Sequence, residues 1–483
     1  MDQNPDISKA SSLLSRFGLD KETAGFVLAV VASAIVLVLL SDFAPSEKRV
    51  LAVVVFMLVL FVAEAVPLAV AGLLGCTGFW VLGGLPFSDA FSGFTENTPW
   101  FILGALMIGA MAVKSKIPDR IAYLVLKKAG LSYPSVLAGM ILLDFVMTII
   151  IPSGSARVVV LCTITMGIIK SFGVDKKSNI AKGMILVLTY AATVFDKTIV
   201  AGAASILARG TIEYSTGTSI SWGKWFIAFA PIDLLTMVAL WLITQKMFPP
   251  ETKRVSYNGS AAFAEQKLRE MGTLTQENYK VSFLLLAATL LWATDFLHGI
   301  SAAKICLTVG LLGFVPGIGI LKREDFSKLN FPIVVFVGAA LSMGLVLTDT
   351  SLLTVASKAS FQWLEPFCGN IHIFSFLLYI SANIFHLFLG NEVALLGSTM
   401  PVVLDFAMNN GLNASTIGMI WTFAAGGKVF IYQSAVLALG YSYGTFSTKD
   451  LFRMGLVIIG VESLLVSIVV PVYWDLIGLG FYM

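Results

Sequence analysis

The chain has 483 residues, of which 57% are hydrophobic and 13% are charged, and its formal net charge is +3. Soluble globular proteins carry about 25% charged residues, so this composition excludes a water-soluble assembly of ordinary domains. Disorder is excluded as well, because disordered segments combine low hydrophobicity with high charge. The small and dispersed positive charge does not indicate nucleic-acid binding. Apolar runs close to twenty residues long recur along the chain and predict an all-α polytopic membrane protein.

The membrane spans follow from these apolar runs in chain order. The first twenty residues are polar and of mixed charge, so they do not form a cleavable signal peptide and the first span is expected to be retained. Eleven spans are predicted near residues 24–41, 50–67, 68–85, 99–116, 180–208, 224–246, 279–298, 301–320, 331–349, 415–440 and 454–479.

Two further apolar stretches, 134–171 and 371–408, are interrupted midway by residues 152–155 and 390–392. Each arm has about 17 residues, which is short for a helix that crosses roughly 30 Å of hydrocarbon. These stretches are therefore predicted to be re-entrant hairpins, which enter and leave the membrane on the same side.

The basic residues support this arrangement and set the orientation. With the N-terminus in the cytoplasm, 23 of the 32 Lys and Arg residues fall in cytoplasmic segments and six fall outside. Such a bias is the positive-inside signal, and treating the hairpins as full spans would erase it. The chain is thus expected to be multi-pass in the plasma or inner membrane. The remaining three basic residues, Arg157, Lys197 and Lys428, lie at membrane depth.

The chain also repeats itself. Residues 100–121 resemble 333–355, the two hairpin tips are about 238 residues apart, and a broken helix follows each tip by about 40 residues. Each copy has five spans, and an odd number inverts the second copy, as in many secondary transporters. The predicted organisation is an N-terminal segment with the first span (1–45), a first repeat (46–247; hairpin 134–171, broken helix 180–208), a cytoplasmic linker (248–278) and a second repeat (279–483; hairpin 371–408, broken helix 415–440).

Two tips and two helix breaks at one depth imply a polar cavity, because unwound backbone in hydrocarbon must line a cavity or be packed in protein. Helix N-termini at the tips present free N–H groups and a partial positive charge, which favour a carboxylate. The predicted substrate-binding residues are Ser153, Gly154, Ser155, Arg157, Thr198, Asn391, Glu392, Val393, Gln433 and Ser434.

The charged residues at membrane depth are expected to be functional, since a charge at the bilayer centre costs at least about 2.5–3.5 kcal/mol. Arg157 is the best single candidate to bind the substrate, because its planar guanidinium matches a carboxylate. An alternative is an internal ion pair, Asp196 with Lys197 or Glu392 with Lys428, that only steadies the unwound backbone. Residues Asp144, Asp233 and Asp405 are expected to be structural or interfacial. No cofactor or metal site is predicted, and the four isolated cysteines are interpreted as buried small hydrophobes.

At these residues the chain resembles the divalent-anion:sodium symporter family, the dicarboxylate/sulfate carriers. Residues 64–68 (Glu-Ala-Val-Pro-Leu) are similar to that family's Glu-Ala-Ile-Pro segment, and 152–157 (Pro-Ser-Gly-Ser-Ala-Arg) resemble its Pro-Ser-Asn-Thr-Ala-Arg tip. The Arg-bearing form is typical of the exchanger branch. Residues 386–401 resemble the second tip, and 441–478 follow the family pattern.

The resemblance implies eleven spans with two hairpins, a scaffold that forms a homodimer in the lipid bilayer, and an elevator-type transport domain. It also implies that both tips bind substrate carboxylates and that the symporters bind sodium between each tip and the facing helix break. Here Gly154 replaces the first tip's Asn, and 391–393 (Asn-Glu-Val) replace Ser-Asn-Thr. Lys197 and Lys428 lie in the breaks, where a fixed ammonium can substitute for a bound cation. The sequence therefore predicts a sodium-independent exchanger of small organic anions, most of all dicarboxylates.

Other functions remain open. One is a proton-coupled symporter in which Glu392 titrates, and another is a sodium symporter whose ion sites lie a turn away. An intramembrane enzyme is less well supported, because the chain has three histidines and no His-Glu-x-x-His, Gly-x-Ser-x-Gly or paired intramembrane aspartate motif. A channel is also less well supported, since closed tips and charged breaks suit an occluding carrier.

Overall fold

The computed structural model describes residues 20–39, 44–128, 132–151, 153–200, 202–251, 258–348 and 352–483. Within these ranges the regular structure is helical, apart from an isolated antiparallel bridge between Leu412 and Tyr482. The predicted all-α class is confirmed.

The first part of the chain begins with α2 (Lys21–Leu39), which precedes the predicted first repeat. The helices of residues 45–247 are α3 (Pro45–Ala63), α4 (Leu68–Val81), α5 (Phe87–Ala90), the 3-10 turn η1 (Ser92–Phe94), α6 (Asn97–Ser115), α7 (Ile117–Lys128), α8 (Tyr133–Ile150), α9 (Gly154–Ser171), α10 (Asn179–Val194), η2 (Phe195–Lys197), α11 (Ala203–Thr216) and α12 (Trp222–Met247).

The second part repeats this order of elements after α13 (Asn258–Glu270). Its helices are α14 (Gln276–Ala293), α15 (Asp295–His298), α16 (Ala302–Leu312), α17 (Arg323–Ser327), α18 (Phe331–Thr348), α19 (Leu352–Phe361), η3 (Gln362–Phe367), α20 (Ile371–Phe388), α21 (Glu392–Asn409), α22 (Ala414–Thr422), η4 (Phe423–Ala425), η5 (Ile431–Gln433), α23 (Ala435–Ser442), α24 (Thr448–Leu464), the π-turn η6 (Leu465–Val469) and α25 (Val470–Leu476). In both parts three apolar helices, a shorter helix, a helix pair, a broken helix and a long helix follow one another.

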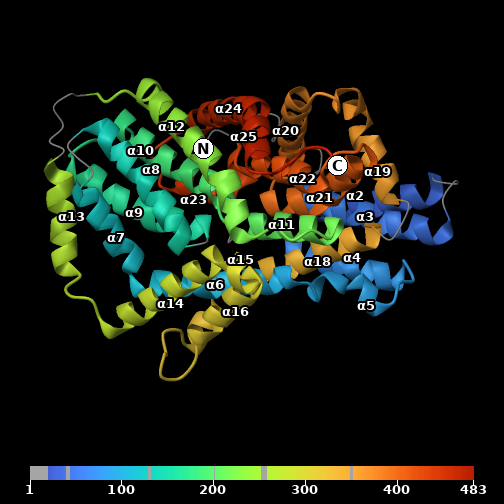
Figure 1. The fold of residues 1–483 in the computed structure, drawn as a ribbon, viewed down its shortest axis with the longest axis horizontal. Helices are drawn as coiled ribbons and strands as arrows, with labels where there is room; N and C mark the ends of the chain where they lie inside the picture. Colours follow the sequence, from blue (N-terminus) through green and yellow to red (C-terminus); the bar gives the residue numbers. More distant parts are fainter. Residues whose placement is uncertain are drawn as a thin grey trace.

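The helices form two packed groups; in Figure 1 most of the first group lies below the second, and its helices α2 and α3 lie at the right. The first group contains α2, α3, α4, α6, α14, α16 and α18, with close pairs α2–α3, α4–α18 and α6–α16. The second group contains the helix pairs α8–α9 and α20–α21, the broken helices α10–α11 and α22–α23, and the long helices α12 and α24–α25. The groups meet where α11 contacts α6 and where α18 contacts α21.

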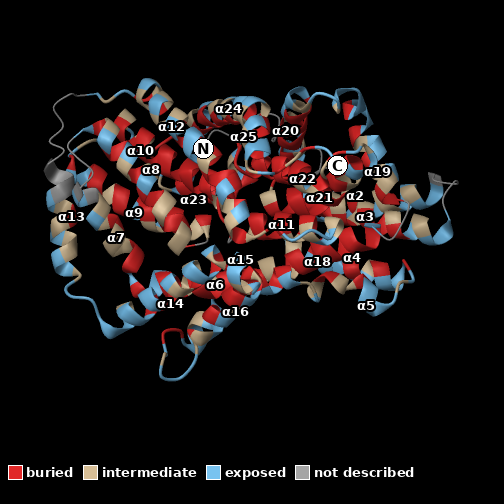
Figure 2. Ribbon diagram, viewed as in Figure 1, coloured by how far each residue is buried: buried red, intermediate tan, exposed pale blue. Residues whose placement is uncertain are grey.

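The centre of the second group is the most thoroughly buried part of the described chain (Figure 2). Every residue from Ile180 to Val194 in α10 is buried except Lys182, and so are 13 of the 18 residues of α21 and eight of the nine residues of α22. A helix that is apolar on all sides packs at the interior rather than at a surface. The broken helices therefore lie where water reaches only through a cavity.

Amphipathic helices lie at the edges of the two groups. Helix α13 packs against α7 and α9 at the left of Figure 1, and α19 packs against α21 at the other side. Helix α13 falls inside the segment 248–278, which was expected to be a polar linker; the linker thus contains a 13-residue helix.

Several predicted spans are shorter in the structure. The span 301–320 ends as helix α16 at Leu312, because Gly313 and the left-handed Gly317 and Gly319 follow. Among the described residues, eight helices are long and apolar enough to cross a membrane, and Leu68–Val81, Ala302–Leu312 and Ala414–Ala425 are shorter apolar segments. The hairpin arms α8, α9 and α20 are among these eight helices. Helix length alone therefore does not decide whether these arms cross the membrane or form re-entrant hairpins. The count of eleven spans stays a prediction.

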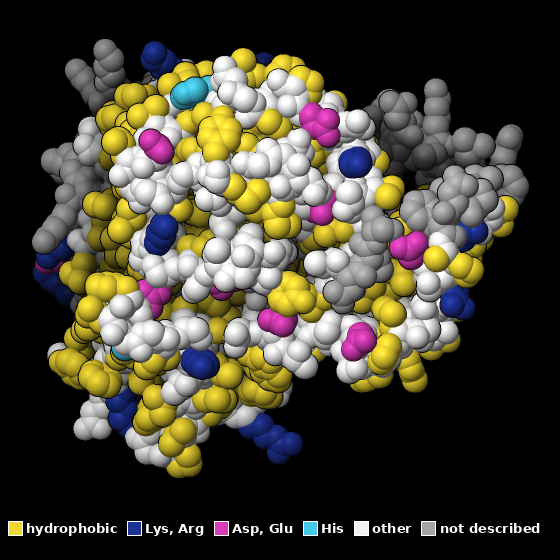
Figure 3. All heavy atoms as spheres, turned by 45° about the vertical axis from the view of Figure 1, so that its right-hand side comes forward, with side chains coloured by type: hydrophobic (Ala, Val, Ile, Leu, Met, Phe, Trp, Pro, Cys, Tyr) yellow, Lys and Arg dark blue, Asp and Glu magenta, His cyan; other side chains and the backbone are white. Residues whose placement is uncertain are grey.

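The outer surface is rich in exposed apolar side chains. Figure 3 shows hydrophobic atoms over much of one face, with charged side chains scattered among them. Large exposed residues occur on both groups, including Val38, Phe283, Phe296 and Leu476. Such surface is stabilised by hydrocarbon rather than by water.

The α6–α16 contact in the first group depends on a glycine. A Cβ atom added at Gly104 would lie 2.6 Å from the Cys306 carbonyl carbon and from the Leu307 nitrogen, which are backbone atoms of α16. Small residues allow membrane helices to approach this closely. Gly109, on the same helix, has no atom within 4 Å of its added Cβ.

We predict that Gly104→Ala lowers stability by about 1–3 kcal/mol, because overpacking forces two helix backbones apart. Gly109→Ala is the matched control and should be neutral or slightly stabilising, since Ala is the better helix former. Thermal unfolding of the two purified variants in detergent measures the difference. Equal melting temperatures would contradict the observed packing.

Candidate functional site

The first hairpin tip joins α8 to α9. Helix α8 ends at Ile150, and Ser153 is the N-cap of α9, where its side chain accepts a hydrogen bond from the Ala156 N–H at 3.4 Å. Ser is among the preferred N-cap residues because its oxygen satisfies a free backbone N–H. The first turn of α9 therefore begins with Gly154 and Ser155 at the tip.

The second tip joins α20 to α21 in the same way. Asn391 is the N-cap of α21, and its side-chain oxygen accepts from the Val393 N–H at 2.8 Å. A Cβ added at Gly390 would lie 3.0 Å from the ring of Tyr432, so the tip packs closely against the second broken helix.

Each broken helix places another helix N-terminus at the same level. In the first, α10 passes through η2, and α11 begins again after Gly202. In the second, Ser434 caps α23 and accepts from the Val436 N–H at 3.2 Å. Gln433 accepts from the N–H groups of Val429 and Phe430 and donates to the His386 carbonyl, so it supports the unwound backbone.

These four helix N-termini meet at one cavity of about 190 Å³. Roughly six water molecules occupy this volume in liquid water, so the cavity is large enough for a small organic ion. The second group lines it with Ser153, Gly154, Ser155, Asp196, Gly202, Ala203, Asn391, Glu392, Val393, Ser434, Ala435 and Val436. The first group adds Ile102, Ala105, Leu106, Asn330 and Ile333.

Seven of the predicted binding residues therefore line the cavity, and three do not. The seven are Ser153, Gly154, Ser155, Asn391, Glu392, Val393 and Ser434. Thr198 points away and donates to Asp233 Oδ2 at 2.7 Å, while Gln433 is held by backbone groups. Arg157 is the third, and Lys197 and Lys428 also lie behind the lining residues. Direct contact of Arg157 with a substrate stays a prediction.

Arg157 is fully buried between the first tip and the first break. Its Nε donates to Asp144 Oδ1 at 3.2 Å, its Nη1 to the Ile151 carbonyl at 3.1 Å, and its Nη2 to the Ala192 carbonyl at 2.8 Å. Asp196 Oδ1 lies 3.8 Å from Nη2. The guanidinium thus ties the end of α8 to the end of α10 and partners two carboxylates.

Lys428 has the corresponding position at the second tip. Its ammonium forms an ion pair with Glu392, the first residue of α21, and is almost completely buried. Of the two ion pairs considered from the sequence, this one is present. It links the second break directly to the second tip.

The other expected pair, Asp196 with Lys197, is wrong. Lys197 Nζ lies 2.9 Å from Asp233 Oδ1 and 2.9 Å from Glu462 Oε1, on α12 and α24. Asp196 and Lys197 are neighbours in the 3-10 turn η2, where successive side chains project about a third of a turn apart. One of them therefore faces the cavity, and the other faces the long helices behind it.

The Lys197 cluster is closed to the cavity. Tyr379 donates to Glu462 Oε2 at 2.7 Å, and Thr198 donates to Asp233. Glu462 was not singled out from the sequence, although a carboxylate in the middle of the apolar run 454–479 signals a buried partner. Asp233 and Asp144, which were expected to be structural or interfacial, lie fully buried within α12 and α8 and pair with Lys197 and Arg157.

Asp405 has a structural role on α21. It accepts hydrogen bonds from Ser357 at 2.5 Å and from Thr354 at 3.4 Å, both on α19, and from Asn409 of its own helix. It does not line the cavity and joins the amphipathic helix α19 to α21.

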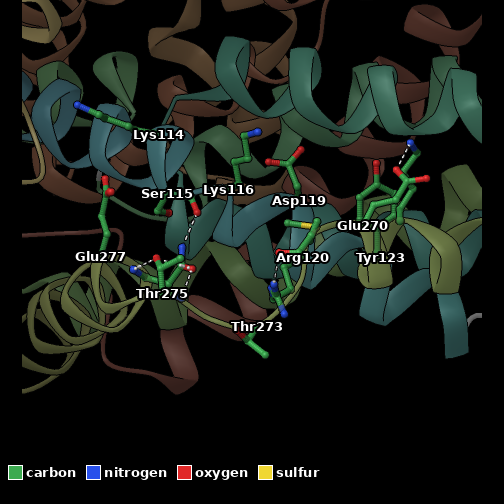
Figure 4. A pocket seen from close by; sticks show the side chains of 13 residues that line it. Lys114, Ser115, Lys116, Asp119, Arg120, Tyr123, Glu270, Thr273, Thr275 and Glu277 are labelled. Atoms are coloured by element: carbon green, nitrogen blue, oxygen red, sulfur yellow. Dashed lines mark hydrogen bonds and ion pairs between the residues drawn. The ribbon is translucent and has the colours of Figure 1, made fainter.

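A larger hollow of about 600 Å³ lies outside this arrangement, at the corner between α6 and α7 (Figure 4). Several of its polar side chains hold neighbouring segments together: Arg120 donates to the Gly272 carbonyl at 2.6 Å, Lys267 pairs with Glu270, and Asn278 donates to the Ser115 carbonyl. It contains no residue of either tip or break. Among the described residues no group of His, Cys, Asp and Glu is arranged to hold a metal ion.

Comparison with known sequences places the chain among membrane transporters. The family described as the sodium:sulfate symporter transmembrane region matches residues 20–479. "Dicarboxylate transporter 2.1, chloroplastic" of Arabidopsis thaliana is 24% identical over 86% of this chain and 76% of its own length. The Escherichia coli inner membrane protein YbhI is 23% identical, covering 86% of each chain, and the Escherichia coli L-tartrate/succinate antiporter is 22% identical, covering 80% of each.

Solved structures show the same fold at lower identity. Neisseria gonorrhoeae MtrF, from a class described as antimetabolite efflux pumps, aligns with a TM-score of 0.58 at 13% identity, over 91% of this chain and 98% of that one. The Alcanivorax borkumensis YdaH transporter aligns with a TM-score of 0.54 at 15% identity, over 80% and 88%. Because the family match extends over nearly the whole length, the chain belongs to the sodium:sulfate symporter family, as its resemblance to the divalent-anion:sodium symporters predicts, and it is a membrane transporter rather than an enzyme.

Proposed function

We propose that the chain is a sodium-independent exchanger of small dicarboxylates in the cell membrane. The observation that carries this proposal is the pair of tethered cations, Arg157 and Lys428, each lying between a hairpin tip and a helix break. Relatives named as dicarboxylate transporters, one of them an antiporter, support the class of substrate.

The cavity offers anion sites made from backbone rather than from side-chain cations. Helices α9, α11, α21 and α23 all begin at its wall. Each helix N-terminus carries roughly half a positive charge and free N–H groups. The side chains of Ser153 and Ser434 add hydroxyl groups beside them. Two such sets on opposite sides suit a short molecule with a carboxylate at each end.

The two tethered cations supply the positive charge that a bound sodium ion would supply at each junction of tip and break. Arg157 donates to carbonyl groups on both sides of the first junction, which a metal ion there would otherwise coordinate. Lys428 neutralises Glu392 at the second junction. With these positions already filled by protein cations, the junctions do not suit a sodium ion. Lys197 reaches neither tip, so its role is to fasten the first break to α12 and α24.

The recurring order of elements supports two inverted repeats and an elevator-type movement. On this proposal the second group carries the cavity, and the first group forms the scaffold and the interface of a homodimer. The scaffold side of the cavity is apolar at Ile102, Ala105, Leu106 and Ile333. An apolar wall allows the tips to slide past it without breaking specific polar contacts. The N-terminus lies in the cytoplasm by the positive-inside bias.

The first test is counterflow in proteoliposomes. Labelled L-malate uptake should rise about tenfold or more when the vesicles contain unlabelled malate, since only the loaded carrier crosses. Replacing sodium by choline on both sides should leave the rate unchanged. Net uptake that requires sodium and ignores internal malate would refute the proposal.

The second test removes the Lys428 ammonium. Lys428→Met leaves the carboxylate of Glu392 unpaired at the cavity and should reduce malate exchange about tenfold or more, the effect of roughly 1.4 kcal/mol. Glu392→Gln in the same chain removes the unpaired charge and should restore part of the activity, which identifies the pair as the cause.

Lys224→Met is the matched control for that test, because Lys224 is exposed in the first turn of α12. It should exchange malate at the wild-type rate. Full activity of Lys428→Met alone would show that the ion pair with Glu392 is dispensable.

A further inference from the structure

The cavity wall has an unexpected charge for a transporter of anions. Among the described residues that line it there is no Lys or Arg, but there are two carboxylates, Asp196 and Glu392. Their side chains are 15% and 16% exposed, so both reach the cavity. Asp196 comes from the first break and Glu392 from the second tip, and both line the same cavity.

The cations behind this wall do not balance its carboxylates. Arg157 is shared between Asp144 and Asp196, and Lys428 is paired with Glu392. Three carboxylates thus face two cations, which leaves one negative charge in excess when all are ionised. A dicarboxylate would bring two more negative charges into the same cavity.

Neighbouring side chains do not supply the missing positive charge, and the partial positive charges of the four helix N-termini are those that would bind the substrate carboxylates. The Lys197 cluster contains one ammonium and the two carboxylates of Asp233 and Glu462, so it has an excess negative charge of its own. The residues that α6 and the start of α18 contribute to the wall are uncharged. Other titratable groups packed around the two breaks include Tyr190, Tyr379, Tyr432 and His386; Tyr432 donates to the Leu387 carbonyl, and the His386 ring contacts the Ala424 carbonyl.

The two cavity carboxylates differ in how firmly they are paired. Glu392 is in direct contact with Lys428, whereas Asp196 competes with Asp144 for one guanidinium. Asp196 Oδ1 and Glu392 Oε2 both lack a hydrogen bond, but Asp196 Oδ1 lies 3.8 Å from Arg157 Nη2, whereas Glu392 Oε2 is in direct ion-pair contact with Lys428. Gly154 and Gly202 pack against the Asp196 carboxylate, and an added Cβ at Gly202 would lie 2.8 Å from Oδ2. Two carboxylates that share one site hold a proton more readily than an isolated one.

We propose that each dicarboxylate binds together with one proton, which Asp196 takes up from the water in the open cavity. This inference rests on the proposed transport of dicarboxylates and adds its coupling ion. The proton removes the excess negative charge of the wall. It also turns Asp196 into a hydrogen-bond donor, and its hydroxyl then faces the carboxylate of the substrate. In an exchange cycle the proton crosses with the substrate in each direction.

The experiment is isothermal titration calorimetry of the full-length protein in detergent with L-malate as the probe. Titrations in two buffers of different ionisation enthalpy give the number of protons taken up on binding. Between about pH 7 and pH 8 malate is fully ionised, so protons taken up there belong to the protein. We expect about one proton for each malate, and an affinity that weakens up to about tenfold per pH unit.

The variant Asp196→Asn places a neutral amide where the protonated acid would be. It should bind malate with no proton uptake and with an affinity that no longer depends on pH. Asp405→Asn is the matched control, because Asp405 lies on α21 away from the cavity; it should keep the wild-type proton count.

Three results would overturn the proposal, and the first needs no variant. Wild-type protein that binds malate without proton uptake would refute it directly while leaving dicarboxylate transport intact. L-aspartate binding more tightly than malate, again without proton uptake, would mean that ionised Asp196 and Glu392 serve an ammonium group of the substrate. Absence of binding by malate, succinate and L-tartrate would remove the proposed function itself, and the coupling with it.

Discussion

The guanidinium of Arg157 joins the ends of three segments, α8, α9 and α10, at the first tip. It reaches the carbonyl of Ile151 after α8, the carbonyl of Ala192 in the last turn of α10, and the carboxylate of Asp144 within α8. Backbone carbonyls at a helix end have no helical partner, and hydrocarbon offers none. A planar group with five donors can satisfy several of them at once. The first tip can therefore stop short of a continuous helix without leaving buried polar groups unpaired.

In the second half of the chain, different residues pair the polar groups at the tip and the break. There the cation comes from the break, as Lys428, and its anion from the tip, as Glu392. Gln433 replaces the guanidinium as the partner of the unwound backbone. The lysine of the first break, Lys197, turns away and fastens η2 to α12 and α24. Two parts of the chain with the same order of elements thus carry different charged groups, and the cavity between the two tips is asymmetric.

The sequence was sufficient to predict where the helices break but not which charges meet there. Glycine, proline and hydroxyl residues inside apolar runs mark the tips and breaks locally. The partners of Lys197 depend on the direction of a side chain in a 3-10 turn and on Glu462, which is 265 residues away in sequence. The ion pair of Asp144 with Arg157 was not predicted, because it forms only when the tip folds α9 back against α8. The end of α16 at Leu312 was missed for a different reason, since the apolar residues continue through the glycines that stop the helix.

The uncharged scaffold side of the cavity explains why charge balance matters for movement as well as for binding. Ile102, Ala105, Leu106 and Ile333 cannot replace water around a free N–H group or an ionised carboxylate. If the tips move along this wall without a substrate, four uncovered helix N-termini and an excess carboxylate charge pass apolar side chains. That movement costs free energy, because these side chains cannot solvate the exposed polar groups. A bound dicarboxylate covers the N–H groups, and a proton on Asp196 removes the excess charge. Movement is then favourable only for the loaded protein, and this condition makes a carrier exchange one anion for another.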